Sequence, residues 1–199
     1  MGGTCVNRGC IPSKVWLRVA YLLHSIRKGD EFDINTSVGQ LAFKAIVARK
    51  NRVSADIRIG MESLLGNNGV ELVRGRAVLK SPREVDVDGT TLEAGKIILA
   101  TGSCLNTPDV PDLEEAALST DHVLEMIDLL SSMLVWGSGP IEVEMATLLN
   151  TFGCKVILVS ESRRILPRED GDTSQRLSKV LMEQGVDLIL GFTLKSVRK

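Results

Sequence analysis

The sequence has few aromatic residues, almost no net charge and no long apolar run. Aromatic residues make up 4% of the 199 positions, and the formal net charge is −1. These values argue against a base-stacking platform and against an electrostatic surface for nucleic acid or anionic lipid. No apolar run approaches the ~20 residues that cross a bilayer. With no signal peptide ahead of the first cysteines, we expect a cytoplasmic protein without nucleic-acid or membrane partners.

Metal-ligating residues are also scarce. The chain has four cysteines and two histidines, and only Cys5 and Cys10 lie close together in the sequence. No second cysteine pair follows at zinc-ligand spacing, and His24 and His122 are expected to be packing or surface residues, so we predict no metal site. Two interpretations of the pair stay open: a redox dithiol able to close into a disulfide, and two unrelated cysteines.

The pair precedes a helix signal. After Pro12, residues 13–28 carry apolar side chains at three- and four-residue spacing, so the dithiol is expected where a loop becomes a helix. A cysteine near a helix N-terminus meets unpaired N–H groups and the positive end of the dipole, which favour the thiolate, and Lys14 adds a cation. Cys104 and Cys154 lie in apolar stretches and are expected to be small core residues.

Residues 2–14 read GGTCVNRGCIPSK. This stretch closely resembles the active-site segment of the flavin-dependent pyridine nucleotide-disulfide oxidoreductases, above all dihydrolipoamide dehydrogenase, with mercuric reductase and glutathione reductase as relatives. The resemblance implies that Cys10 faces the flavin, that Cys5 exchanges with the disulfide substrate and that Lys14 lies beside the isoalloxazine ring. It also implies that Gly3 and Thr4 contact the FAD.

The rest of the first half predicts one more helix and several strands. A helix is expected over residues 37–65, with Ser37 as its cap, after a loop at residues 30–36. Strands are expected over residues 70–73, 77–80, 85–87 and 91–92, and over residues 96–100, whose continuous apolar run is typical of a strand covered on both faces.

The strand at residues 96–100 leads into a second motif. Ala100, Thr101 and Gly102, followed by Ser103, resemble the second flavin-domain signature of the same family, at about the family's separation from the dithiol. The resemblance implies that the glycine lets the backbone pass close to the FAD. More weakly, it implies that Gly75 and Ala77 lie near the adenine.

The second half has the order of a dinucleotide-binding unit. A connector marked by two prolines and a short helix with a cap near Asp121 are followed by a strand at residues 133–136 and a glycine turn at 137–139. A helix over 140–152, a strand over 155–159, a helix over 173–184 and a strand over 186–190 complete the pattern. By resemblance, the NAD(P) contacts are Gly137, Gly139, Ile141, Glu144 near the nicotinamide, and Glu161 at the ribose.

Two residues depart from the nucleotide fingerprint. Glu142 stands where the third glycine is expected and brings volume and negative charge near the phosphates, and Pro140 removes a backbone N–H from the turn. We therefore predict weak nucleotide affinity. Glu161 favours NAD, whereas Arg163 and Arg164 favour the 2′-phosphate of NADP, and the choice stays open.

We therefore expect an α/β fold with an incomplete Rossmann-like FAD-binding domain over residues 1–115 and a partial NAD(P)-binding Rossmann domain over residues 116–199. The upstream unit for the ADP half of FAD and the C-terminal His–Glu segment of the family, which carries the homodimer interface, are not found. The expected protein is a fragment of a flavoprotein disulfide reductase passing electrons between NAD(P)H, FAD and the dithiol, and it is weakly active or inactive. The expected substrate class is a small disulfide or dithiol, and the choice among lipoamide, glutathione, mercuric ion and others stays open. The alternatives are a nucleotide-binding pseudoenzyme and a flavin-free thiol redox or interaction protein.

Overall fold

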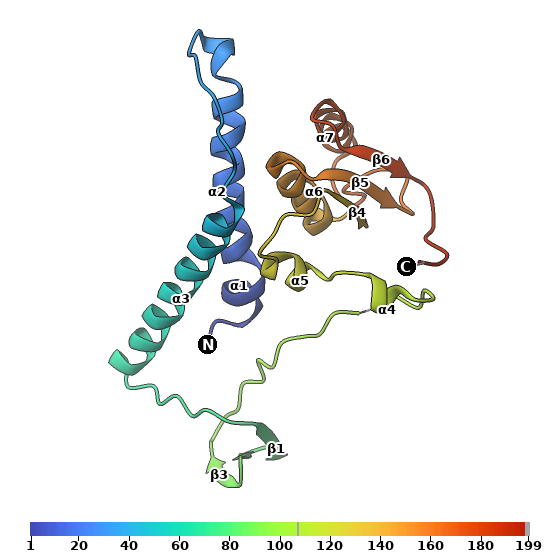
Figure 1. The fold of residues 1–199 in the computed structure, drawn as a ribbon. Helices are drawn as coiled ribbons and strands as arrows, with labels where there is room; N and C mark the ends of the chain where they lie inside the picture. Colours follow the sequence, from blue (N-terminus) through green and yellow to red (C-terminus); the bar gives the residue numbers. More distant parts are fainter. Residues whose placement is uncertain (107, 198–199) are drawn as a thin grey trace.

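The computed structural model describes residues 1–106 and 108–197. Figure 1 shows three parts along the chain: a pair of long helices, an extended middle segment that carries a small antiparallel sheet, and a carboxy-terminal layer of parallel strands and helices. The expected α/β class is confirmed. No helix in the described ranges is both long and apolar enough to cross a bilayer.

The amino-terminal helices are α1 (Gly3–Arg8) and α2 (Cys10–Arg27), followed by the 3-10 helix η1 (Gly29–Phe32). The helical conformation is interrupted at Gly9, which ends α1 and precedes α2. The dithiol therefore lies in two consecutive helices rather than in a loop, and α2 begins at Cys10 rather than at residue 13. The prediction missed α1 because six residues containing glycine and threonine carry no apolar periodicity of their own.

Helix α3 (Phe43–Asn67) begins six residues later than the predicted cap at Ser37. Ser37 is exposed, and the N-cap of α3 is Ala42, which makes no side-chain cap bond. Residues 34–42 instead run back along α2, where the Thr36 hydroxyl donates to the Ile26 carbonyl (Figure 1). The start of α3 follows from tertiary packing, because the Phe43 ring lies 5.4 Å from that of Trp16.

The middle segment holds an antiparallel sheet in the order β1-β2-β3. Its strands are β1 (Ala77–Ser81), β2 (Glu84–Val87) and β3 (Thr90–Glu93). All three were predicted, and the turn between β2 and β3 lies at Asp88 and Gly89, both with positive φ.

Two predicted strands of this segment are wrong. Residues 70–73 and 96–100 form no strand, and the side chains of Ile98 and Leu99 are 91% and 69% exposed. An apolar run becomes a buried strand only when neighbouring strands pair with its backbone. Among the described residues, both sheets are built from other segments, so this run lies extended in solvent (Figure 1).

The carboxy-terminal layer is a parallel sheet in the order β4-β5-β6 with alternating helices. This βαβαβ order agrees with the predicted half of a Rossmann fold. Its elements, after the short helices α4 (Leu113–Ala116) and α5 (Thr120–Glu125), are β4 (Ser132–Trp136), α6 (Pro140–Phe152), β5 (Lys155–Ser160), α7 (Gly171–Glu183) and β6 (Asp187–Leu190).

One apolar core joins the helix pair to this layer. The rings of Trp16, Phe43 and Phe152 meet with centroid distances of 5.4, 5.9 and 5.8 Å. Beside them, Leu148 and Leu149 of α6 are fully buried. The core therefore holds α2 and α3 against α6, while the antiparallel sheet lies away from it (Figure 1).

Helix α5 begins with a capping box and makes one buried polar contact with α3. Its N-cap is Ser119 rather than Asp121: the His122 N–H donates to the Ser119 hydroxyl, and His122 Nδ1 accepts from the Ser119 N–H. His122, expected to be a surface or packing residue, is exposed and completes this capping box. Lys50 Nζ of α3 donates to the Leu124 carbonyl at 2.5 Å.

Candidate functional site

The two cysteines of the dithiol lie next to each other. Cys5 is in α1 and Cys10 is the first residue of α2, and both are exposed free thiols. A side-chain hydrogen bond with Cys10 is the main cause that raises the pKa of the Cys5 thiol. Desolvation and the charge of Cys10 also raise this pKa, and a backbone hydrogen bond from Cys10 lowers it, so the predicted effect of N–H groups on Cys5 is outweighed.

Polar contacts that the sequence did not reveal hold α1 in place. The Asn7 side-chain amide donates to the Gly3 carbonyl at 2.9 Å and to the Met1 carbonyl at 3.0 Å. Its oxygen accepts from Arg58 of α3 at 2.7 Å. Arg58 is 51 residues away along the chain, so no local sequence pattern indicates this contact.

Lys14 and Glu144 form an ion pair between the two halves of the predicted site. Lys14 Nζ lies 2.7 Å from Glu144 Oε1, with side-chain exposures of 62% and 22%. Lys14 stands four residues after Cys10 on α2, so the two share a helical face. The structure thus brings together a residue expected beside the flavin and one expected beside the nicotinamide.

Of the other residues expected at the FAD, Gly3 and Thr4 lie in α1 directly before Cys5, whereas the remaining five lie away from the dithiol. Ala100, Thr101 and Gly102 are exposed in the extended segment, and Gly75 and Ala77 lie at the antiparallel sheet (Figure 1). Gly75 has a local role there: its φ is +151°, and a Cβ atom would collide with the side chain of Asp88. Their assignment to FAD stays a prediction.

The nucleotide turn is firmly held. Between β4 and α6, the Ser160 hydroxyl donates to the Ser138 hydroxyl at 2.8 Å, and the Leu166 N–H donates to the Ser138 carbonyl at 2.7 Å. A hollow of about 560 Å³ opens beside the turn. It is lined by Pro108, Asp109, Val110, Trp136, Gly137, Ser138, Ser160, Glu161, Thr193 and Leu194. Three features predicted for nucleotide binding, the strand end, the glycine turn and Glu161, therefore meet at one place.

The glycine turn itself is filled by Glu142. A Cβ atom added to Gly137 would lie 2.6 Å from Glu142 Cγ, and one added to Gly139 would lie 2.8 Å from Glu142 Oε2. The space that the glycines leave free thus holds a carboxylate of the same chain. In the structure described, this carboxylate lies where a dinucleotide pyrophosphate is expected, and the weak nucleotide affinity stays a prediction. Ile141, also predicted to bind the nucleotide, is 55% exposed and does not line the hollow.

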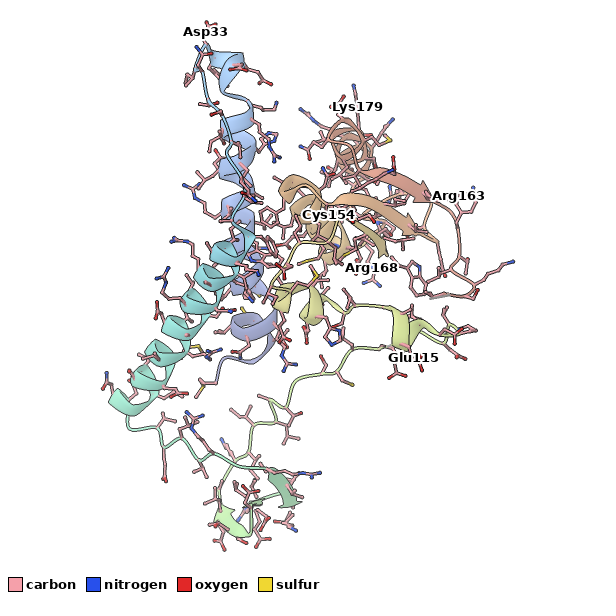
Figure 2. All side chains as sticks on the ribbon, in the orientation of Figure 1. Asp33, Glu115, Cys154, Arg163, Arg168 and Lys179 are labelled. Atoms are coloured by element: carbon pink, nitrogen blue, oxygen red, sulfur yellow. The ribbon has the colours of Figure 1, made fainter. Side chains whose placement is uncertain are left out.

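The two arginines beyond Glu161 differ in their contacts. The guanidinium of Arg164 donates to the carbonyls of Pro167 and Glu169, at 2.7 and 3.1 Å. It thereby holds its own loop instead of facing the hollow. Arg163 extends outward from the edge of the layer (Figure 2). Neither arginine lines the hollow, whereas Glu161 does.

The remaining cysteines behave differently from each other. Cys154, the residue directly before β5, is 2% exposed, and burial raises the pKa of its thiol (Figure 2). Its prediction as a core residue is confirmed. Cys104 is exposed, so its prediction as a core residue is wrong, because the described residues 98–106 around it are all exposed as well. In residues 1–106 and 108–197 no cluster of His, Cys, Asp or Glu has the geometry of a metal site.

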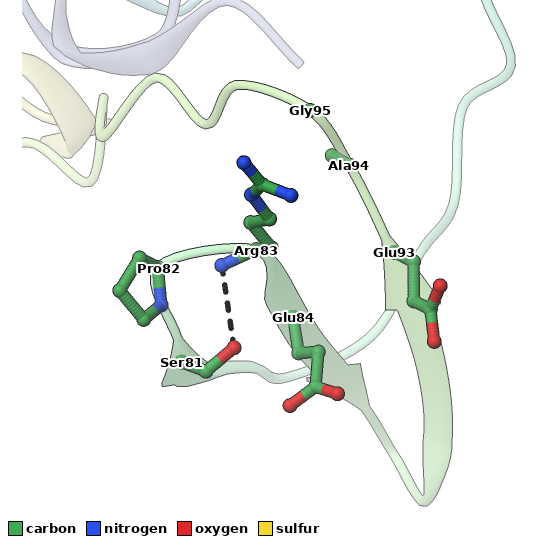
Figure 3. A pocket seen from close by; sticks show the side chains of 7 residues that line it. All are labelled: Ser81, Pro82, Arg83, Glu84, Glu93, Ala94 and Gly95. Carbon is green, nitrogen blue, oxygen red and sulfur yellow. Dashed lines mark hydrogen bonds between the residues drawn. The ribbon is translucent and has the colours of Figure 1, made fainter.

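A second hollow lies far from the dithiol. It measures about 700 Å³ and opens between residues 81–84 and 93–95 of the antiparallel sheet, where the Arg83 N–H donates to the Ser81 hydroxyl (Figure 3). None of the residues predicted to bind a cofactor lines it.

The chain is similar to known redox proteins over nearly its whole length. The family model described as "Pyridine nucleotide-disulphide oxidoreductase" matches residues 1–199. A dihydrolipoyl dehydrogenase of Acholeplasma laidlawii is 34% identical over 204 residues, which cover 99% of this chain and 60% of that protein. A mercuric reductase of Bacillus cereus is 31% identical over 201 residues, covering all of this chain and 32% of that protein.

A solved structure shares the fold. The HOCl-induced flavoprotein disulfide reductase RclA from Escherichia coli matches with a TM-score of 0.84 and 27% identity, over 98% of this chain and 42% of RclA. The chain therefore spans between about a third and three fifths of the length of these relatives.

Proposed function

Because this chain belongs to the pyridine nucleotide-disulphide oxidoreductase family, we propose that it carries the thiol–disulfide part of that family's chemistry on Cys5 and Cys10. The family consists of flavoprotein oxidoreductases that bind FAD and NAD(P). The observation that carries the proposal is that two exposed free thiols, at the start of consecutive helices, interact closely enough for Cys10 to raise the pKa of Cys5.

The proposed reaction is exchange with a small disulfide. The Cys5 thiolate attacks one sulfur of the substrate, releases one thiol and forms a mixed disulfide. The Cys10 thiolate then attacks the sulfur of Cys5, forms the Cys5–Cys10 disulfide and releases the second thiol. Two electrons and two protons pass from the protein to the substrate. Lipoamide and glutathione disulfides are both substrates of this chemical kind.

We place the flavin-binding part in residues 1–115 and the NAD(P)-binding part in residues 116–199. Lys14, paired with Glu144 on the face that carries Cys10, supports a flavin position beside the dithiol. The segments expected to enclose the rest of FAD lie apart from it, so the residues present do not form a complete cradle. We therefore expect this chain to turn over weakly or not at all. The family is homodimeric. We place the protein in the cytoplasm, where exposed thiols stay reduced.

A specific observation also favours a flavin-free thiol redox protein. Both thiols are exposed, and neither Cys5 nor Cys10 lines either of the two hollows described above. Purified protein distinguishes the alternatives. Flavin absorbance supports the flavoprotein, a colourless protein whose melting temperature shifts with NADH supports a nucleotide-binding pseudoenzyme, and a colourless protein with an exchanging dithiol supports the flavin-free form.

The decisive experiment is oxidation of the reduced chain with oxidised lipoamide, followed by peptide mass spectrometry. We expect a Cys5–Cys10 cross-link that is lost in Cys5→Ser and in Cys10→Ser and kept in the control Cys104→Ser. Cross-links of either cysteine to Cys104, or no oxidation at all, would contradict the proposed function.

A further inference from the structure

Glu142 stands on the first turn of α6, directly above the glycine turn. The first turn of a helix leaves N–H groups unpaired and carries positive partial charge, which is the basis of phosphate binding at such places. Pro140 removes one of these N–H groups. A carboxylate benefits from the same partial charge as a phosphate does, so the position stabilises the Glu142 side chain where it lies.

The glycines of the turn accommodate this side chain. The Cβ position of Gly137 lies 2.6 and 2.9 Å from Cγ and Cδ of Glu142, and that of Gly139 lies 2.8 Å from Oε2. These distances are far below ordinary contact, so only glycines leave room for the carboxylate. Among the described residues no lysine or arginine forms an ion pair with Glu142.

The turn has little freedom to move away from this carboxylate. The bonds of Ser138 to Ser160 and Leu166 hold it from the far side, and the Gly137 N–H donates to the Val159 carbonyl at 2.8 Å. Room for a pyrophosphate therefore requires that the Glu142 side chain itself swings out. The hollow beside the turn adds no compensating cation, because its lining includes Asp109 and Glu161 but neither lysine nor arginine.

We infer that the Glu142 carboxylate occupies the pyrophosphate-binding site of its own chain and thereby excludes dinucleotides. The adjoining hollow stays open to an uncharged nucleoside. This inference rests on the proposed function, since it concerns the nucleotide half of the same protein. Two effects add up: the side chain fills the cradle, and its charge repels the phosphates.

Three variants of the full chain separate these effects in calorimetric titrations with NADH and with adenosine. Glu142→Gly removes volume and charge, Glu142→Ala does the same with less cost to the helix, and Glu142→Gln keeps the volume and removes the charge. We expect Glu142→Gly and Glu142→Ala to bind NADH about ten- to a hundredfold more tightly than the wild type, and Glu142→Gln to gain less. Adenosine, which has no phosphate, should bind all four proteins alike.

Circular dichroism establishes that each variant is folded. The inference is overturned if the folded Gly and Ala variants bind NADH no more tightly than the wild type, or if adenosine gains as much as NADH. Failure of the proposed function has a different signature, because it appears as a missing Cys5–Cys10 cross-link in the wild type whatever the nucleotide affinities are.

Discussion

Lys14 Nζ and Glu144 Oε1 lie 2.7 Å apart and join helix α2, which carries Cys10, to helix α6, which begins at the nucleotide turn. The pair lies at the surface, since the lysine side chain is 62% exposed. Water and salt screen such a pair, and its contribution to stability is therefore small even though it joins the two functional halves.

This ion pair gives the first prediction. Lys14→Met should lower the free energy of unfolding by less than about 1 kcal/mol, and a double-mutant cycle with Glu144→Gln should give a coupling energy of about 0.2–1 kcal/mol that shrinks in high salt. Urea unfolding measures both. The exposed pair Lys179–Glu183, at 3.8 Å, is the matched control and should show a smaller coupling. Equal coupling in the two pairs would contradict the prediction.

The second prediction concerns the pH dependence of Cys5. Because its hydrogen bond with Cys10 raises the pKa of the Cys5 thiol, the rate of exchange at Cys5 should still be rising with pH where an ordinary exposed thiol has levelled off. Cys10→Ala removes the partner and should move the profile to lower pH. Rates of alkylation of Cys5, followed by mass spectrometry, measure the profile.

Cys104→Ser is the control for that experiment and should leave the Cys5 profile unchanged. Cys10→Ser keeps a hydrogen-bonding side chain and should move the profile less than Cys10→Ala does. A profile that is the same in the wild type and in Cys10→Ala would show that Cys10 does not set the reactivity of Cys5.

The third prediction concerns the aromatic core. Phe152→Ala should cost about 3–5 kcal/mol, because the ring packs against both Trp16 and Phe43. Trp16→Phe should cost less than Phe152→Ala, because it removes fewer buried atoms and because the Trp16 indole N–H has no hydrogen-bond partner to lose among the described residues. Urea unfolding compares the two variants, and a larger loss for Trp16→Phe would refute this account.

The fourth prediction concerns Lys50, which is 5% exposed. Burial lowers the pKa of its ammonium group. The negative charge of Glu125 raises this pKa, but by less than burial lowers it. Between the lowered pKa and the ordinary lysine value, the unfolded chain binds more protons than the folded one, so the Lys50 contribution to stability rises with pH in this window. The raised pKa values of Cys5 and Cys154 act in the opposite direction.

The difference between the wild type and Lys50→Met isolates the lysine. Lys50→Met leaves the Leu124 carbonyl without its donor, which should cost about 1–3 kcal/mol. The stability advantage of the wild type over this variant should increase from neutral to alkaline pH in urea unfolding. A constant or shrinking difference would count against the assigned direction of the pKa.

Local sequence patterns were sufficient wherever an element's neighbours follow directly in the chain. The helix over residues 140–152, ended by Gly153 at φ +107°, and the strands on either side of it were predicted almost to the residue. In this unit each strand pairs with the next one along the chain, so periodicity and glycine positions determine the fold. The hairpin strands β1 to β3 were predictable for the same reason.

The predictions failed where distant partners decide. The apolar run at residues 96–100 indicated a buried strand, yet no sheet among the described residues pairs with it. The start of α3 depends on the contact of Phe43 with Trp16. The position of α1 depends on the hydrogen bond from Arg58, a residue far along the chain. Burial and ion pairs between such segments leave no periodic signal.

Residues 2–14 were sufficient to indicate the family, and the order of helices and strands and the presence of Glu142 in the nucleotide fingerprint could also be read without coordinates. The three-dimensional arrangement was needed to learn that Cys10 raises the pKa of Cys5, that Lys14 meets Glu144, and that the Glu142 carboxylate folds back over Gly137 and Gly139. The physical reason is that composition and spacing specify which groups a turn of chain presents, whereas side-chain direction and the packing of remote helices specify what those groups meet.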